Sequence, residues 1–129
     1  MYVYKKHFSV EEAASYIDRL RETLKDIQVL ANSLRKIGFD PYTGKYKIGF
    51  HPDSYEEYPV DFKKMLEMIR DITRQGVEIK GLEQGLIDFP AIRPNGDEVF
   101  LCWKVDEQAI EFWHTLDGGY RGRHHIDDF

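Results

Sequence analysis

The sequence holds a single cysteine, Cys102, among 129 residues, so it cannot form a disulfide within one chain. It also lacks any apolar run near the roughly 18 residues that a membrane-spanning helix needs. The opening residues Met1–His7 have no apolar core of the kind found in secretory signal peptides. These absences argue against a disulfide-stabilised or membrane-spanning domain, and we expect a cytoplasmic protein.

Positive charge is not in excess either, because the formal net charge is −5 at pH 7. Proteins that bind nucleic acid without sequence preference rely on lysine and arginine to neutralise phosphates. We therefore expect neither nucleic acid nor membrane as a partner. A hydrophobic content of 42% and a charged content of 32% are typical of a folded chain, and the length fits a single domain spanning 1–129.

The N-terminal part predicts one long helix over residues 9–38. Ser9 and Glu12 have the spacing of a capping box, and Gly38 offers a C-terminal stop. Apolar residues recur in steps of three and four, as in a coiled-coil seam. They are Val10, Ala13, Ile17, Leu20, Leu24, Ile27, Ala31 and Leu34.

A second, shorter helix is predicted over residues 59–76, beginning at Pro59 and ending at Gly76. The turn-rich segment 39–58 between the helices predicts an ordered loop, with a possible strand over Lys45–Phe50. The first helix has about 28 residues and its partner only about 16, so part of the apolar stripe should lack a neighbour. We therefore predict a homodimer that associates through this stripe.

Residues 77–129 change from helical to extended patterning. After a short strand at Val77–Lys80, the runs Leu86–Arg93 and Glu98–Lys104 flank Asn95-Gly96, a strong signal for an antiparallel hairpin. Pro90 cannot donate a ladder hydrogen bond, which predicts an edge or bulge position and argues against a central place for the first strand.

Beyond the hairpin, Asp106 can cap a short final helix that ends at Gly118-Gly119. Its apolar face would be formed by Ala109, Ile110, Trp113 and Leu116. The tail Tyr120–Phe129 has no predicted element. The predicted fold class is therefore α+β, a long antiparallel helical hairpin with a small C-terminal β-hairpin and a short helix.

Several C-terminal segments carry a resemblance to a known family. They are Gly85-Leu-Ile-Asp-Phe-Pro-Ala, Leu101-Cys-Trp, Trp113-His114 and Leu116-Asp-Gly-Gly-Tyr-Arg-Gly-Arg. With the opening His7-Phe-Ser-Val-Glu-Glu-Ala, these residues resemble a bacterial family of small proteins classed as a domain of unknown function. The resemblance implies a helical hairpin joined to a small C-terminal unit, and it implies no activity.

The glycine-rich segment after Asp117 predicts a small anion pocket, because backbone amides and two arginines can converge on a carboxylate or phosphate. The candidate ligand-binding residues are Asp88, Trp103, His114, Asp117, Arg121 and Arg123. The alternative is a tight turn in which Arg121 and Arg123 pair with Asp88 or Asp117.

A metal site and a catalytic thiol are two further hypotheses for the C-terminal residues. His114, His124, His125, Asp117, Asp127, Asp128 and Cys102 are of metal-ligating types, but none has a specific ligand spacing. Cys102 could act as a nucleophile with His114, although strand alternation also allows it to be a buried apolar residue beside Phe100.

We therefore predict a cytoplasmic binding or interaction protein with a helical association surface, and we expect no cofactor and no metal. A possible small anion is the predicted ligand. The alternative is a small enzyme or metal-binding protein that uses His114 with Asp88 and Asp117. The sequence leaves open whether the protein is an enzyme.

Overall fold

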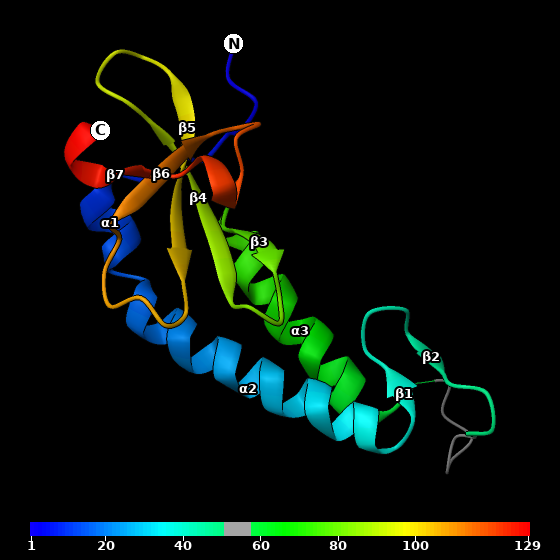
Figure 1. The fold of residues 1–129 in the computed structure, drawn as a ribbon. Coiled ribbons are helices and arrows are strands. Elements are labelled where there is room, and N and C mark those ends of the chain that lie inside the picture. Colours follow the sequence, from blue (N-terminus) through cyan, green and yellow to red (C-terminus); the bar gives the residue numbers. More distant parts are fainter. Residues whose placement is uncertain (51–57) are drawn as a thin grey trace.

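The structure is a computed structural model that describes residues 1–50 and 58–129. It has an α+β fold, with three α-helices, a two-stranded sheet and a five-stranded antiparallel sheet in those residues. The larger sheet lies at one end of the helices and the small sheet at the other (Figure 1). The predicted α+β class is confirmed, but the sheet is larger than the single hairpin expected.

The predicted long helix is two helices, α1 (Val10–Ala14) and α2 (Ile17–Lys36). Its start is confirmed, because the Ser9 hydroxyl accepts a hydrogen bond from the Glu12 amide at 3.0 Å. The interruption falls at Ser15, whose hydroxyl donates to the Glu12 carbonyl. A serine side chain that bonds to the preceding turn competes with the helical pattern and bends the chain there.

Helix α2 packs against α3 (Val60–Arg74), and its apolar stripe lies inside the chain. Every stripe residue from Ala13 to Leu34 is buried, and Leu24, Ile27 and Leu34 have no exposed surface. The expectation of an uncovered helical association surface is therefore wrong, because α3 and the sheet cover the stripe within one chain.

The segment after α2 forms a small antiparallel sheet from β1 (Phe39–Asp40) and β2 (Lys45–Tyr46). The strand predicted over Lys45–Phe50 is thus only two residues long. Gly38 permits the preceding turn, since its φ is 76° and a side chain there would come within 2.2 Å of the Phe50 ring. The rest of the predicted loop, 51–57, lies outside the described residues.

The five-stranded sheet has the order β3-β4-β5-β6-β7, with all neighbours antiparallel. The strands are β3 (Glu78–Gly81), β4 (Leu86–Ile92), β5 (Glu98–Lys104), β6 (Phe112–Thr115) and β7 (His124–His125). The predicted hairpin is confirmed as β4 and β5, whose residues pair from Leu86↔Lys104 to Ile92↔Glu98.

The predicted final helix is wrong, because its residues form a turn and then β6. Trp113 pairs with Leu101 on β5 and is 4% exposed. A short helix is marginally stable in water by itself, whereas pairing with β5 buries the Trp113 side chain. The tail also has structure: Tyr120–Gly122 and Ile126–Asp128 form 3₁₀ turns on either side of β7.

Pro90 lies in β4, which is an interior strand of the sheet, so the prediction that its strand is not central is wrong. The predicted edge position is nevertheless correct for Pro90 itself. The registered pairing of β3 with β4 ends at Asp88, and beyond it the Pro90 carbonyl accepts from the Phe8 amide at 2.7 Å. Pro90 therefore occupies a local edge where no ladder donor is required.

Candidate functional site

The sheet has two faces of different character. The helices cover the face that carries Phe89, Leu101 and Trp103, all members of the main core. The opposite face carries Asp88 and Cys102, because residues paired across antiparallel strands share a face. His114 joins them from β6, where it pairs with Phe100.

The length of the β4–β5 loop decides which residues meet on this face. Arg93 and Asp97 close a loop of three residues, and Gly96 within it has a φ of 94°. If Asn95-Gly96 formed a two-residue turn instead, the register would slip and Asp88 would oppose Trp103. A one-residue slip moves side chains to the other face, so this loop brings Asp88 opposite Cys102.

Asp88, Cys102 and His114 form a buried cluster with converging ligand atoms. One carboxylate oxygen, the Cys102 Sγ and one imidazole nitrogen all lie within 4.8 Å of one another. Asp88 and His114 are each 2% exposed and Cys102 is 0% exposed. No second group of three such side chains converges within residues 1–50 and 58–129.

Both nitrogens of His114 have defined partners. Nδ1 lies 2.6 Å from the Thr115 carbonyl oxygen, which only accepts, so Nδ1 carries a proton. Nε2 lies 3.0 Å from Asp88 Oδ2. Asp88 Oδ1 is buried and has no hydrogen-bond partner among the described residues. The cluster therefore holds one buried carboxylate oxygen that has no N–H or O–H donor among the described residues.

The environment of the cluster raises the pKa of both His114 and Cys102. Burial by itself lowers the pKa of His114, but the hydrogen bonds to Asp88 and Thr115 and the charge of Asp88 together raise it above the ordinary value. Burial, reinforced by the Asp88 charge, raises the pKa of the Cys102 thiol to about 12. Cys102 is therefore a protonated thiol at neutral pH, which does not fit a catalytic nucleophile.

The structure does not bring the six candidate ligand-binding residues into one pocket. Asp88 and His114 are in contact, but Trp103 lies on the helix face, where its indole N–H donates to the Glu107 carbonyl. Asp117 is exposed and accepts a hydrogen bond from the Thr115 hydroxyl at 2.9 Å.

The two arginines also differ from expectation. Arg121 is exposed. Arg123 forms an ion pair with Glu107 at 2.7 Å, and its guanidinium lies 3.8 Å from the centre of the Phe112 ring. The predicted pairing of Arg123 with Asp88 or Asp117 is therefore wrong, because Glu107 folds back beside β5 and supplies the carboxylate.

The terminal histidines lie outside the buried cluster. His124 stacks on Trp113 with ring centres 4.5 Å apart, and the Arg93 guanidinium lies 4.2 Å from the same indole ring. His125 is exposed and lies 3.3 Å from Asp127. These contacts attach the tail to β6, and neither histidine belongs to the converging group.

Comparison with known families assigns the chain. The family described as "Uncharacterized conserved protein (DUF2203)" matches residues 6–126. The chain belongs to this family. No curated protein and no solved structure matched the chain. Membership in DUF2203 confirms the resemblance to a family without an assigned activity, so function must be argued from the site.

The predicted anion-binding set contained Asp88 and His114 but not Cys102, and the metal-ligating set contained Cys102 and His114 but not Asp88. The hairpin was predicted, but a two-residue Asn95-Gly96 turn would have placed Asp88 opposite Trp103, so the sequence did not indicate that Asp88 and Cys102 meet. What the sequence did not show was β6, so the approach of His114 to both residues could not be seen.

Proposed function

We propose that this protein binds one divalent transition-metal ion through Asp88, Cys102 and His114. The observation that carries the proposal is the convergence of a carboxylate oxygen, a sulfur and an imidazole nitrogen at a buried point. Carboxylate oxygen, thiolate sulfur and imidazole nitrogen are the ligand types that bind zinc in proteins. Zn²⁺ is the ion whose ligand preferences match this donor set best.

The environment of His114 supports the proposal. A metal-ligating histidine usually donates its other ring N–H to a carbonyl or carboxylate, which fixes the nitrogen that faces the metal. The Nδ1–H of His114 donates to the Thr115 carbonyl, so Nε2 is the inward nitrogen. The unpartnered Asp88 Oδ1 gives the carboxylate a lone pair that a cation would satisfy.

Charge balance also supports a divalent ion. The carboxylate of Asp88 and a thiolate at Cys102 together carry two negative charges, and a neutral His114 carries none. A divalent cation would make the buried group neutral, which removes the electrostatic cost of burying either anion alone. This proposal takes up the metal-binding alternative with Asp88 and His114, and leaves out the exposed Asp117.

The same burial makes the other candidate functions weaker. A general base must reach a substrate proton, whereas the His114 side chain is 3% exposed. Of the two candidate anion-binding arginines, Arg123 is already paired with Glu107 and Arg121 is exposed.

The test is a competition titration of metal-free protein with Zn²⁺ against a chromophoric chelator. We expect one zinc ion per chain, with affinity at least 100-fold weaker in Cys102→Ser and His114→Gln. Asp117→Asn and His124→Gln are matched controls because both residues are exposed, and they should bind as the wild type does. Circular dichroism checks that each variant is folded. Failure of the wild type to compete, or equal weakening in the controls, would contradict the proposal.

A further inference from the structure

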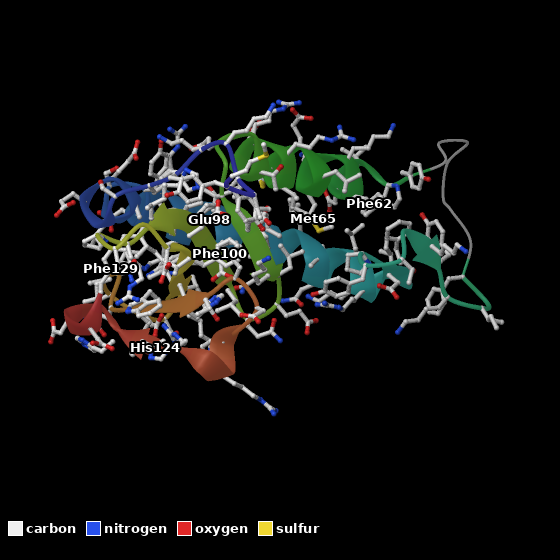
Figure 2. All side chains as sticks on the ribbon, turned by 90° about the horizontal axis from the view of Figure 1, so that it is seen from above. Phe62, Met65, Glu98, Phe100, His124 and Phe129 are labelled. Atoms are coloured by element: carbon white, nitrogen blue, oxygen red, sulfur yellow. The ribbon has the colours of Figure 1, made fainter. Side chains whose placement is uncertain are left out.

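The N-terminal residues 2–8 cross the sheet face that carries the buried cluster, and we call them the N-terminal strap. The Phe8 amide donates to the Pro90 carbonyl at 2.7 Å, which attaches one end to the edge of β4. The amides of Val3 and Tyr4 donate to the Glu98 carboxylate at 2.8 and 2.9 Å. Figure 2 shows Glu98 and Phe100 beside the dark blue N-terminal segment.

Tyr4 places an aromatic ring next to the cluster. Its ring centre lies 5.2 Å from that of Phe100, which lies 5.4 Å from that of His114. The Tyr4 hydroxyl donates to Glu78 at 3.2 Å, and Glu78 is the cross-strand partner of Asp88. The Tyr4 side chain therefore extends from β5 to β3, across the strand that carries Asp88.

Glu98 is the side chain that receives the most contacts from the strap. Besides the two amides, its carboxylate lies 2.7 Å from His7 Nε2, so three groups of the strap meet one side chain. Other parts of the strap are exposed: Tyr2 is 47% exposed and Val3 72%. Before Phe8, which is buried in the core, the strap is held mainly by polar contacts, at Glu98, at Glu78 and at the Gly96 carbonyl. Such a segment opens more easily than the strands beneath it.

The other side of this face is held more firmly. Arg123 pairs with Glu107, and its guanidinium lies close to the rings of both Phe112 and Tyr120. Glu107 also accepts a hydrogen bond from the Lys104 amide at 2.8 Å. Glu107 thus binds one backbone amide and the Arg123 guanidinium, in a region that packs around two aromatic rings.

We propose that the N-terminal strap is the movable cover of the cluster, and that its release from Glu98 admits the metal ion. Cys102 and His114 are almost completely buried, so an ion can reach them only when a covering segment moves. The identity of the ion rests on the proposed function. The movement of the strap does not depend on the proposed function, because Cys102 is the only cysteine in the sequence and its reaction with a thiol reagent measures its exposure.

The experiment measures how fast native, metal-free protein reacts with methyl methanethiosulfonate at Cys102. Glu98→Ala and Tyr4→Ala should react at least tenfold faster than the wild type. Asp117→Asn is the control, since it alters an exposed carboxylate that does not contact the strap, and it should change the rate less than threefold. Denaturant unfolding of each variant separates local opening from loss of global stability.

Rates that follow global stability alone in all variants would overturn the proposal, and so would an increase in Asp117→Asn as large as that in Glu98→Ala. A second measurement tests the metal: zinc transfer to excess chelator should be at least tenfold faster from Glu98→Ala than from the wild type. If no zinc binds but the thiol reaction rates are as predicted, metal binding is contradicted and the movable strap is supported. If zinc binds but neither rate depends on Glu98, only the movable strap is contradicted.

Discussion

His114 and Asp88 lie on strands that are not neighbours, β6 and β4, and their side chains meet at 3.0 Å above β5. The pair is buried on the sheet face away from the helices. A buried imidazole and a buried carboxylate are each costly alone, so the two groups depend on each other. Cys102 comes from the strand between them, and all three residues therefore form one unit.

The first prediction concerns pH. Because the folded-state pKa of His114 is raised, its pairing with Asp88 stabilises metal-free protein fully below the unfolded value of about 6.5. This stability is lost as the pH rises through the folded pKa, with a slope of at most about 1.4 kcal/mol per pH unit. Denaturant unfolding in the presence of chelator should show the decline.

Asp88→Asn is the variant that identifies the source of this decline. It removes the charge that favours the imidazolium, so the slope should become shallower and the protein should lose about 2 kcal/mol or more at pH 6. Asp117→Asn, at an exposed carboxylate, should leave the pH dependence unchanged. Identical slopes in wild type and Asp88→Asn would show that the pair does not couple to folding.

The second prediction concerns protons released by metal binding. Zn²⁺ must displace the Cys102 proton, since the thiol pKa is about 12, and the proton on His114 Nε2 where the imidazolium is populated. About two protons per ion should leave below the His114 pKa and about one above it. Calorimetry in buffers of different ionisation enthalpy measures this number. Release of no proton at neutral pH would exclude a thiolate ligand.

The third prediction separates the two arginines of the glycine-rich turn. Arg123→Ala should cost about 2–3 kcal/mol of unfolding free energy, because it leaves Glu107 without its ion pair and removes the contact with Phe112. Arg121→Ala should cost less than about 1 kcal/mol, as the residue is exposed. Thermal or denaturant unfolding of both variants decides; equal small losses would contradict a structural role for Arg123.

The fourth prediction concerns association. The homodimer stays a prediction, and sedimentation equilibrium at micromolar concentration tests it; a mass of one chain would contradict it. The structure changes what Leu24→Glu should do. Leu24 has no exposed surface within one chain, so a charge there should unfold the protein instead of only separating two copies. A folded monomeric Leu24→Glu variant would contradict that burial.

Much of the fold could be predicted where one local rule decides. The start of α1 at Ser9, the α3 segment and the β4–β5 hairpin follow from capping, helical spacing and turn chemistry. The alternation that sends Cys102 to one face and Trp103 to the other is also as predicted. Family membership, inferred from the C-terminal residues, is confirmed at the level of an uncharacterised family.

The remainder depended on contacts between distant residues. Trp113 and His114 carry spacing that suits a helix as well as a strand, and only pairing with β5 makes them β6. Glu107 was not a candidate partner for Arg123 because nothing local indicates that it turns back toward that side chain. The cluster could not be predicted because it depends on two features that the sequence did not indicate, the register set by the β4–β5 loop and the strand β6.

The central claim is that Cys102 ligates a metal ion together with His114 and Asp88. The most direct measurement is the absorption spectrum of metal-free protein titrated with Co²⁺, which reports cobalt geometry and sulfur ligation together. The account predicts a thiolate-to-cobalt charge-transfer band in the near ultraviolet that saturates at one ion per chain and disappears in Cys102→Ser. A wild-type spectrum identical to that of free Co²⁺, or a band that persists in Cys102→Ser, would contradict it.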